Sequence, residues 1–256
     1  MTSRVGTAPT APGDLRALLL IARRAALEAL RDRATLLMNL FFSLVFPIAM
    51  VVWVIRPLAA QASASDQPGA LGPLLAIYLM LVGVLPATSA VGIASGQFAG
   101  EKEQGSLTPL LASPASNVAI FGGKVLAAVI PGLLFAVVAE VVYVAGLALV
   151  VGPTTARALP LALALVVVAL VPAFAVFAAT VASLISSRVR TFNTAQQIGG
   201  VVLVPLYGLL SVLTGKIGSW GAAGLAAAVA GLVVADIALT LVSAATWRRE
   251  EVLAQQ

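Results

Sequence analysis

The sequence predicts an all-α integral membrane protein: six transmembrane helices preceded by an N-terminal amphipathic helix at the membrane interface. Of its 256 residues, 61% are hydrophobic and 10% are charged, whereas soluble domains carry about 25% charged residues. The apolar residues form six runs, most of them at or above the roughly 20 residues that a transmembrane helix needs. The chain also contains no His and no Cys, which removes the commonest zinc ligands and the thiol nucleophiles. We therefore expect no metal site and no catalytic residue on this chain.

The N-terminal region precedes the first apolar run. Residues 1–13 contain Gly and Pro without any periodicity, which predicts a disordered cytoplasmic tail. Residues 14–34 predict an interfacial amphipathic helix with Asp14 as its N-cap. Its apolar side would hold Leu15, Leu18, Leu19, Ala22, Ala26, Ala29 and Leu30. An Arg-rich helix before a span is expected at the membrane surface, and the alternative is a loosely attached basic helix.

A six-helix transmembrane domain is predicted over residues 35–246. Its apolar segments are 35–58, 73–97, 119–151, 159–186, 198–214 and 222–246. Five of these contain an interior proline, and each proline can bend its helix either as a hinge or as a fixed packing feature: Pro47, Pro86, Pro131, Pro172 and Pro205. Residues 247–256 form the predicted cytoplasmic C-terminal tail, which begins with Trp247 and Arg248 at the membrane interface.

The distribution of Lys and Arg predicts the orientation. With the N-terminus inside, 12 of the 15 cations fall on the cytoplasmic side, and only Arg56, Arg157 and Lys216 fall outside. This positive-inside bias predicts a multi-pass protein of the cell membrane with both termini in the cytoplasm. The cations lie at the ends of apolar runs rather than on one basic surface, so we expect membrane lipid as a partner and no nucleic acid.

The most informative segment is the cytoplasmic connection after the second span, within residues 99–118. Ser106 is a suitable N-cap for a short helix whose leucines would share one face. Such a helix is suited to a groove on another protein, and the alternative is an ordinary loop helix that rests on the lipid surface. The segment reads Glu101-Lys102-Glu103-Gln104-Gly105-Ser106-Leu107-Thr108-Pro109-Leu110-Leu111-Ala112-Ser113-Pro114.

This pattern, followed by Gly123-Lys124 where the third span begins, resembles the signature of type-2 ABC transporter permeases. The interfacial helix, the six spans and the two inner termini resemble the same family over nearly the whole chain. Two positions differ from the usual pattern: Ser106 replaces Thr, and Thr108 replaces Glu. The first change keeps the cap, and the second removes any salt bridge that the family makes from that position.

The resemblance implies a permease subunit that works with a second permease copy or a homologous permease and with two ATPase subunits. The ATPase-coupling region would then include Glu101, Glu103, Gly105, Leu107, Leu110, Leu111 and Pro114. The chain has no phosphate-binding loop, because Val125 follows Gly123-Lys124 and Ile217 follows Gly215-Lys216 where Ser or Thr is required. ATP and Mg are therefore expected on the partner ATPase, with no cofactor and no enzymatic activity on this chain.

Two carboxylates lie inside apolar segments, Glu140 in the third and Asp236 in the sixth. Acids inside the membrane are candidates for a substrate path or a proton relay. The alternative is a protonated acid that bonds to a neighbouring helix. Beside Asp236, a stripe of small residues at four-residue spacing offers a close helix contact instead.

The favoured hypothesis is the permease subunit of an ATP-driven exporter that moves a hydrophobic or amphipathic substrate, such as a drug or a lipid. The alternative is a secondary transporter or channel coupled to protons or cations through Glu140 and Asp236. A membrane-embedded enzyme is a third possibility, but the sequence contains no assembled catalytic group.

Overall fold

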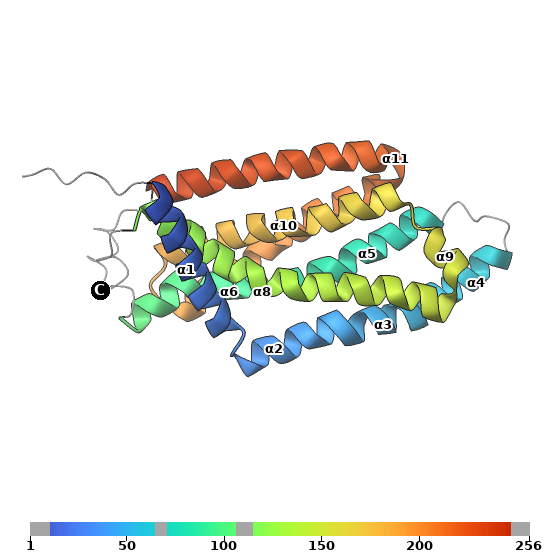
Figure 1. Cartoon of the computed structure of the whole chain (residues 1–256), viewed down its shortest axis with the longest axis horizontal. Coiled ribbons are helices and arrows are strands. Elements are labelled where there is room, and N and C mark those ends of the chain that lie inside the picture. Colours follow the sequence, from blue (N-terminus) through green and yellow to red (C-terminus); the bar gives the residue numbers. More distant parts are fainter. Residues whose placement is uncertain (1–10, 65–70, 106–114, 247–256) are drawn as a thin grey trace, which may run out of the picture.

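The computed structural model describes residues 11–64, 71–105 and 115–246. These residues form helices and no strand, which confirms the all-α membrane fold. Within them, five helices are long and apolar enough to cross a membrane: Arg33–Ala62, Leu71–Glu103, Asn117–Val151, Leu161–Arg188 and Ser219–Ser243. The helices lie side by side along the long axis of the molecule (Figure 1).

The first span is a series of short segments around Pro47. α2 (Arg33–Leu40) begins at the N-cap Asp32, whose carboxylate accepts the Thr35 N–H at 2.9 Å. Two π-helical turns, η1 (Phe41–Val45) and η2 (Val51–Ile55), flank α3 (Phe46–Met50), and α4 (Arg56–Ala64) completes the span. Because proline has no N–H and crowds the preceding turn, the helix widens next to Pro47 and does not break.

The second span consists of two helices, α5 (Leu71–Ala87) and α6 (Ser89–Glu103). They meet just after Pro86, where the Thr88 hydroxyl donates to the Leu85 carbonyl at 2.7 Å and the Ser89 hydroxyl donates to the Pro86 carbonyl at 2.7 Å. These side chains satisfy carbonyls that the interrupted ladder leaves open.

The third and fourth spans form the centre of the bundle. α8 (Asn117–Gly146) continues into η4 (Leu147–Val151), the short helix α9 (Pro153–Arg157) follows, and α10 (Leu161–Arg188) returns. Pro131 and Pro172 lie inside continuous helices. The buried core draws mainly on α5, α6, α8 and α10.

The last helical stretch is α11 (Phe192–Thr246), which contains a non-helical residue at Gly221 with φ of 61°. At this residue the chain turns back, so that the second arm runs beside the bundle (Figure 1). The predicted fifth segment, 198–214, falls within the first arm, and the predicted sixth, 222–246, is the second arm. The first arm is not among the five helices that qualify as spans in the described part of the chain, so the count of six stays a prediction.

The N-terminal helix α1 (Ala11–Ala29) crosses one end of the bundle, where α6 ends and α8 begins (Figure 1). We call this the α1 end. The predicted N-cap role of Asp14 is wrong, because α1 begins at Ala11 and Asp14 lies in its first turn. Of the predicted apolar side, Ala22 and Ala26 are buried in the molecule, and Leu15 and Leu19 lie on its surface.

Candidate functional site

The segment that was predicted to couple to an ATPase lies at the α1 end. Of its predicted residues, Glu101, Glu103 and Gly105 are described, and Leu107, Leu110, Leu111 and Pro114 lie outside the described residues. Gly105 has φ of 65° directly after the C-cap of α6. Glycine adopts this left-handed conformation at little cost, so it ends α6 inside the predicted segment.

A buried ion pair joins the end of α6 to the start of α8. Lys124 Nζ lies 2.6 Å from Glu101 Oε2, and the Lys124 side chain is 1% exposed while that of Glu101 is 33% exposed. The same ammonium donates to the Gln97 carbonyl at 2.7 Å and lies 4.7 Å from the centre of the Phe98 ring. The Phe98 ring in turn stacks on Phe121 at 5.7 Å. Glu101, one of the two acidic residues of the predicted coupling segment, is therefore tied to α8.

The end of α6 is also tied to the end of α10. Lys102 Nζ donates to the carbonyls of Ser187 at 2.7 Å and Val189 at 3.2 Å, at and just beyond the last turn of α10. The buried Ser186 hydroxyl donates to the Ser95 carbonyl at 2.6 Å and accepts the Ala99 N–H at 3.1 Å. Displacement of the α6 end therefore acts on both α8 and α10.

Helix α1 is held against the start of α8. Asp14 Oδ1 accepts the N–H of Ser116, the N-cap residue of α8, at 3.2 Å. A Cβ on Gly123 would lie 3.0 Å from the Leu18 carbonyl oxygen and 3.1 Å from Ile21 Cβ. The glycine thus lets the two helices approach closely, and α1 is held at the same end of the bundle as the end of α6 and the start of α8.

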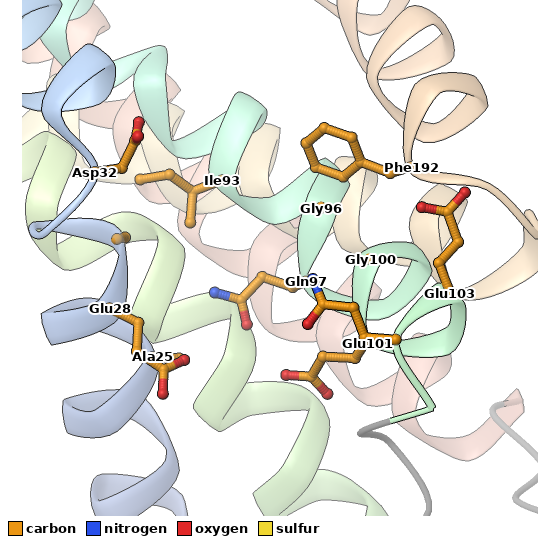
Figure 2. Close-up of a pocket in the computed structure, with 12 residues that line it drawn as sticks. Ala25, Glu28, Asp32, Ile93, Gly96, Gln97, Gly100, Glu101, Glu103 and Phe192 are labelled. Carbon is orange, nitrogen blue, oxygen red and sulfur yellow. The ribbon is translucent and has the colours of Figure 1, made fainter.

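A cavity of about 550 Å³ opens between α1, α6 and the start of α11 (Figure 2). Four carboxylates line it, together with two amides, Ile93, the Phe192 ring and small residues: Glu28, Asp32, Glu101, Glu103, Gln97, Gln104, Ala25, Ala29, Gly96 and Gly100. Hydrogen bonds from the side chain and the N–H of Thr35 lower the pKa of Asp32. Among the described residues that line the cavity there is no Lys or Arg.

The two intramembrane acids lie away from this cavity. Glu140 is 7% exposed, and its Oε1 occupies the space where a Cβ on Gly83 would be, next to Val171. It therefore packs between α8, α5 and α10 inside the chain's own bundle. Asp236 is 6% exposed on the second arm of α11. Within the described part of the chain, one oxygen of each acid has no hydrogen-bond partner.

Several of these contacts were not predicted. The sequence marked Gly123 and Lys124 only as part of the motif, whereas in the structure Gly123 permits close helix packing and Lys124 forms the ion pair with Glu101. The approach of Asp32 and Phe192 to the end of α6 had no sequence signal, because these residues lie on elements far apart in the chain. The sequence showed only that one residue is acidic and the other aromatic, which does not predict that they lie close together.

One comparison with known proteins identifies the family of the chain. The family model of the ABC-2 type transporter matches residues 16–220, which cover most of α1 and the bundle as far as the turn of α11. No curated protein matches the chain. Because the family model covers well over half of the sequence, the chain belongs to the ABC-2 type transporter family and is a multi-pass membrane permease component.

Proposed function

We propose that this permease is the transmembrane subunit of an ATP-driven exporter and takes its energy from separate ATPase subunits. Two ATPase subunits, with ATP and Mg bound to them, would act on a pair of permeases, this chain and a second copy or a homologue. The cargo is a hydrophobic or amphipathic molecule that leaves the cell across the cell membrane. Both termini then face the cytoplasm, in accord with the distribution of Lys and Arg.

The observation that carries this proposal is the set of polar contacts at the end of α6. Glu101 is paired with Lys124 of α8, and Lys102 is bonded to carbonyls at the end of α10. The predicted coupling segment, residues 99–118, contains both residues and continues through Gly105, which directly follows the C-cap of α6. A push on that segment would move three spans together, which is what a motor outside the membrane requires.

The secondary-transporter alternative depends on Glu140 and Asp236. Glu140 packs against Gly83 and Val171 within a single bundle, a position suited to helix packing. This geometry favours the ATP-driven function over a proton or cation path through Glu140.

The test is co-purification of an ATPase subunit with the chain, followed by transport in proteoliposomes. Leu107→Asp with Leu110→Asp should remove the ATPase and abolish transport-stimulated ATP hydrolysis. Thr108→Glu is the matched control, because it also adds an acid to the segment but on the side of the predicted helix away from the leucines. If the leucine variant keeps the complex and its ATP hydrolysis, the coupling role is wrong. Transport by the purified chain alone under an ion gradient would favour the alternative.

A further inference from the structure

The cavity at the α1 end is lined by more negative than positive charge. Glu28 is paired with Arg24 at 3.0 Å, and Glu101 with Lys124 at 2.6 Å. Asp32 is hydrogen-bonded by Thr35 and remains without a cation, and Glu103 has no ion pair among the described residues. Two carboxylates in the lining thus have no ion-pair partner among the described residues. A guest that carries positive charge would meet attraction without displacing either existing ion pair.

A buried amide in the cavity wall also lacks a partner. Gln97 is 9% exposed, and its Oε1 makes no hydrogen bond within the described part of the chain. Its side chain extends from α6 toward α1, where Ala25 and Glu28 lie (Figure 2). A buried acceptor without a donor costs free energy, and a native protein usually satisfies such an atom with a ligand or water. The wall therefore contains a buried carbonyl oxygen whose hydrogen-bonding capacity is not used by the described residues.

An aromatic ring forms another part of the wall. Phe192, at the start of α11, packs on Gly96 so closely that a Cβ there would lie 2.6 Å from Phe192 Cε2. The residue is still 38% exposed, so part of it remains accessible from the cavity. Aromatic faces attract cations, and aromatic rings are a common way of recognising organic ammonium groups.

From these three observations we propose that the cavity between α1, α6 and Phe192 binds an organic cation as the cargo enters from the cytoplasm. Asp32 and Glu103 would attract the charge, the Gln97 carbonyl would accept a hydrogen bond where the cation has a donor, and Phe192 would cover its apolar part. A volume of about 550 Å³ is within the usual range of small-molecule pockets. This inference rests on the proposed export function and narrows its cargo to cationic amphiphiles.

The test is equilibrium binding of tetraphenylphosphonium to the full chain in nanodiscs, with no ATPase present. Wild-type protein should show a saturable component above that of empty nanodiscs. Asp32→Asn with Glu103→Gln should weaken it, by roughly three- to tenfold for each charge, taking a distance of ~6 Å and an effective dielectric constant of ~40–80. Asparagine also caps helices, so α2 keeps an N-cap in this variant although it loses the charge of Asp32.

The aromatic contribution is tested separately. Phe192→Leu should weaken binding about two- to fivefold, and Phe192→Tyr should retain it. Trp53→Leu is the matched control, because Trp53 is 76% exposed on the first span and far from the cavity residues in sequence. Tetraphenylborate, which has the same shape and the opposite charge, should show no saturable binding.

Several outcomes would overturn the inference: unchanged affinity in the Asp32/Glu103 variant, or equal saturable binding of tetraphenylborate. A third is a variant that binds tetraphenylphosphonium normally but no longer retains the ATPase. That result would assign the cavity to a basic side chain of the ATPase. Failure of the proposed function is a different result, in which wild-type chain binds the cation but retains no ATPase and transports without one.

Discussion

The ion pair between Lys124 and Glu101 makes an asymmetric prediction about stability. The Lys124 side chain is 1% exposed and that of Glu101 is 33% exposed. Among the described residues, Glu101→Gln leaves the buried cation with the Gln97 carbonyl and the Phe98 ring as direct partners and with the charge of Glu28 farther away. Removal of one partner from a buried pair costs about 3–5 kcal/mol, and because Glu101 is partly solvated we expect about 2–4 kcal/mol.

Lys124→Met should cost less, about 1 kcal/mol, because it leaves a carboxylate that water can reach and it fills the same volume with an apolar side chain. The double variant should be close to Lys124→Met and more stable than Glu101→Gln alone. The measurement is equilibrium unfolding of the four proteins in mixed micelles, followed by circular dichroism. Equal costs for the two single changes, with an additive double variant, would refute the reasoning.

Three further perturbations follow from close contacts and from the cap of α2. Gly199→Ala should destabilise the protein by about 1–3 kcal/mol, because the new methyl would overlap a serine hydroxyl of α6, whereas Gly200→Ala, with open space around it, should be neutral in the same unfolding assay. Gly83→Ala should likewise destabilise, and Glu140→Ala in the same chain should restore part of the loss, since the carboxylate occupies the space the methyl needs; no rescue would contradict that contact. The lowered pKa of Asp32 adds stability that is complete above the ordinary value of 3.8 and is lost as pH falls through the lower folded value. Thermal midpoints of wild type and Asp32→Asn should therefore converge in acid, and a constant difference would exclude the linkage.

Much of the bundle was predictable because its helices are long apolar runs bounded by charge. The predicted segment 159–186 corresponds to α10 (Leu161–Arg188), and the predicted 119–151 corresponds to α8 with η4. The predicted and observed segments agree because the thickness of the membrane requires a minimum number of apolar residues in each span, whatever its neighbours are. The π-helical turns around Pro47 and the break after Pro86 were less predictable, because proline specifies a lost hydrogen bond but not how the chain compensates for it.

Which residues on the apolar side of α1 pack against the bundle was not predicted, for a physical reason. Periodicity in the sequence locates an apolar face, but that face can lie against either the protein or the lipid. The alanines Ala22 and Ala26 face the protein, where small side chains allow close packing, and the exposed Leu15 and Leu19 are left for another apolar surface. Hydrophobicity alone does not distinguish a protein neighbour from a lipid one, whereas side-chain size does.

The sequence located the end of α6, but it did not predict which residues meet there to form the cavity. The motif around Glu101 marks where α6 ends, yet the partner of Glu101 is Lys124, and the neighbours of Gln97 in the cavity include Asp32 and Phe192 from elements on either side of the motif. Each residue taken alone has an ordinary explanation as a cap, a loop acid or a core aromatic. Their convergence depends on α1 crossing the bundle, and that crossing depends on the close approach of the Leu18 backbone to Gly123.

Gly123→Ala should therefore weaken tetraphenylphosphonium binding, although Gly123 does not itself line the cavity. Gly122→Ala should not weaken it, because the new methyl would meet only the end of the Leu18 side chain at 3.4 Å. If both variants bind the cation as wild type does, the position of α1 does not shape the cavity.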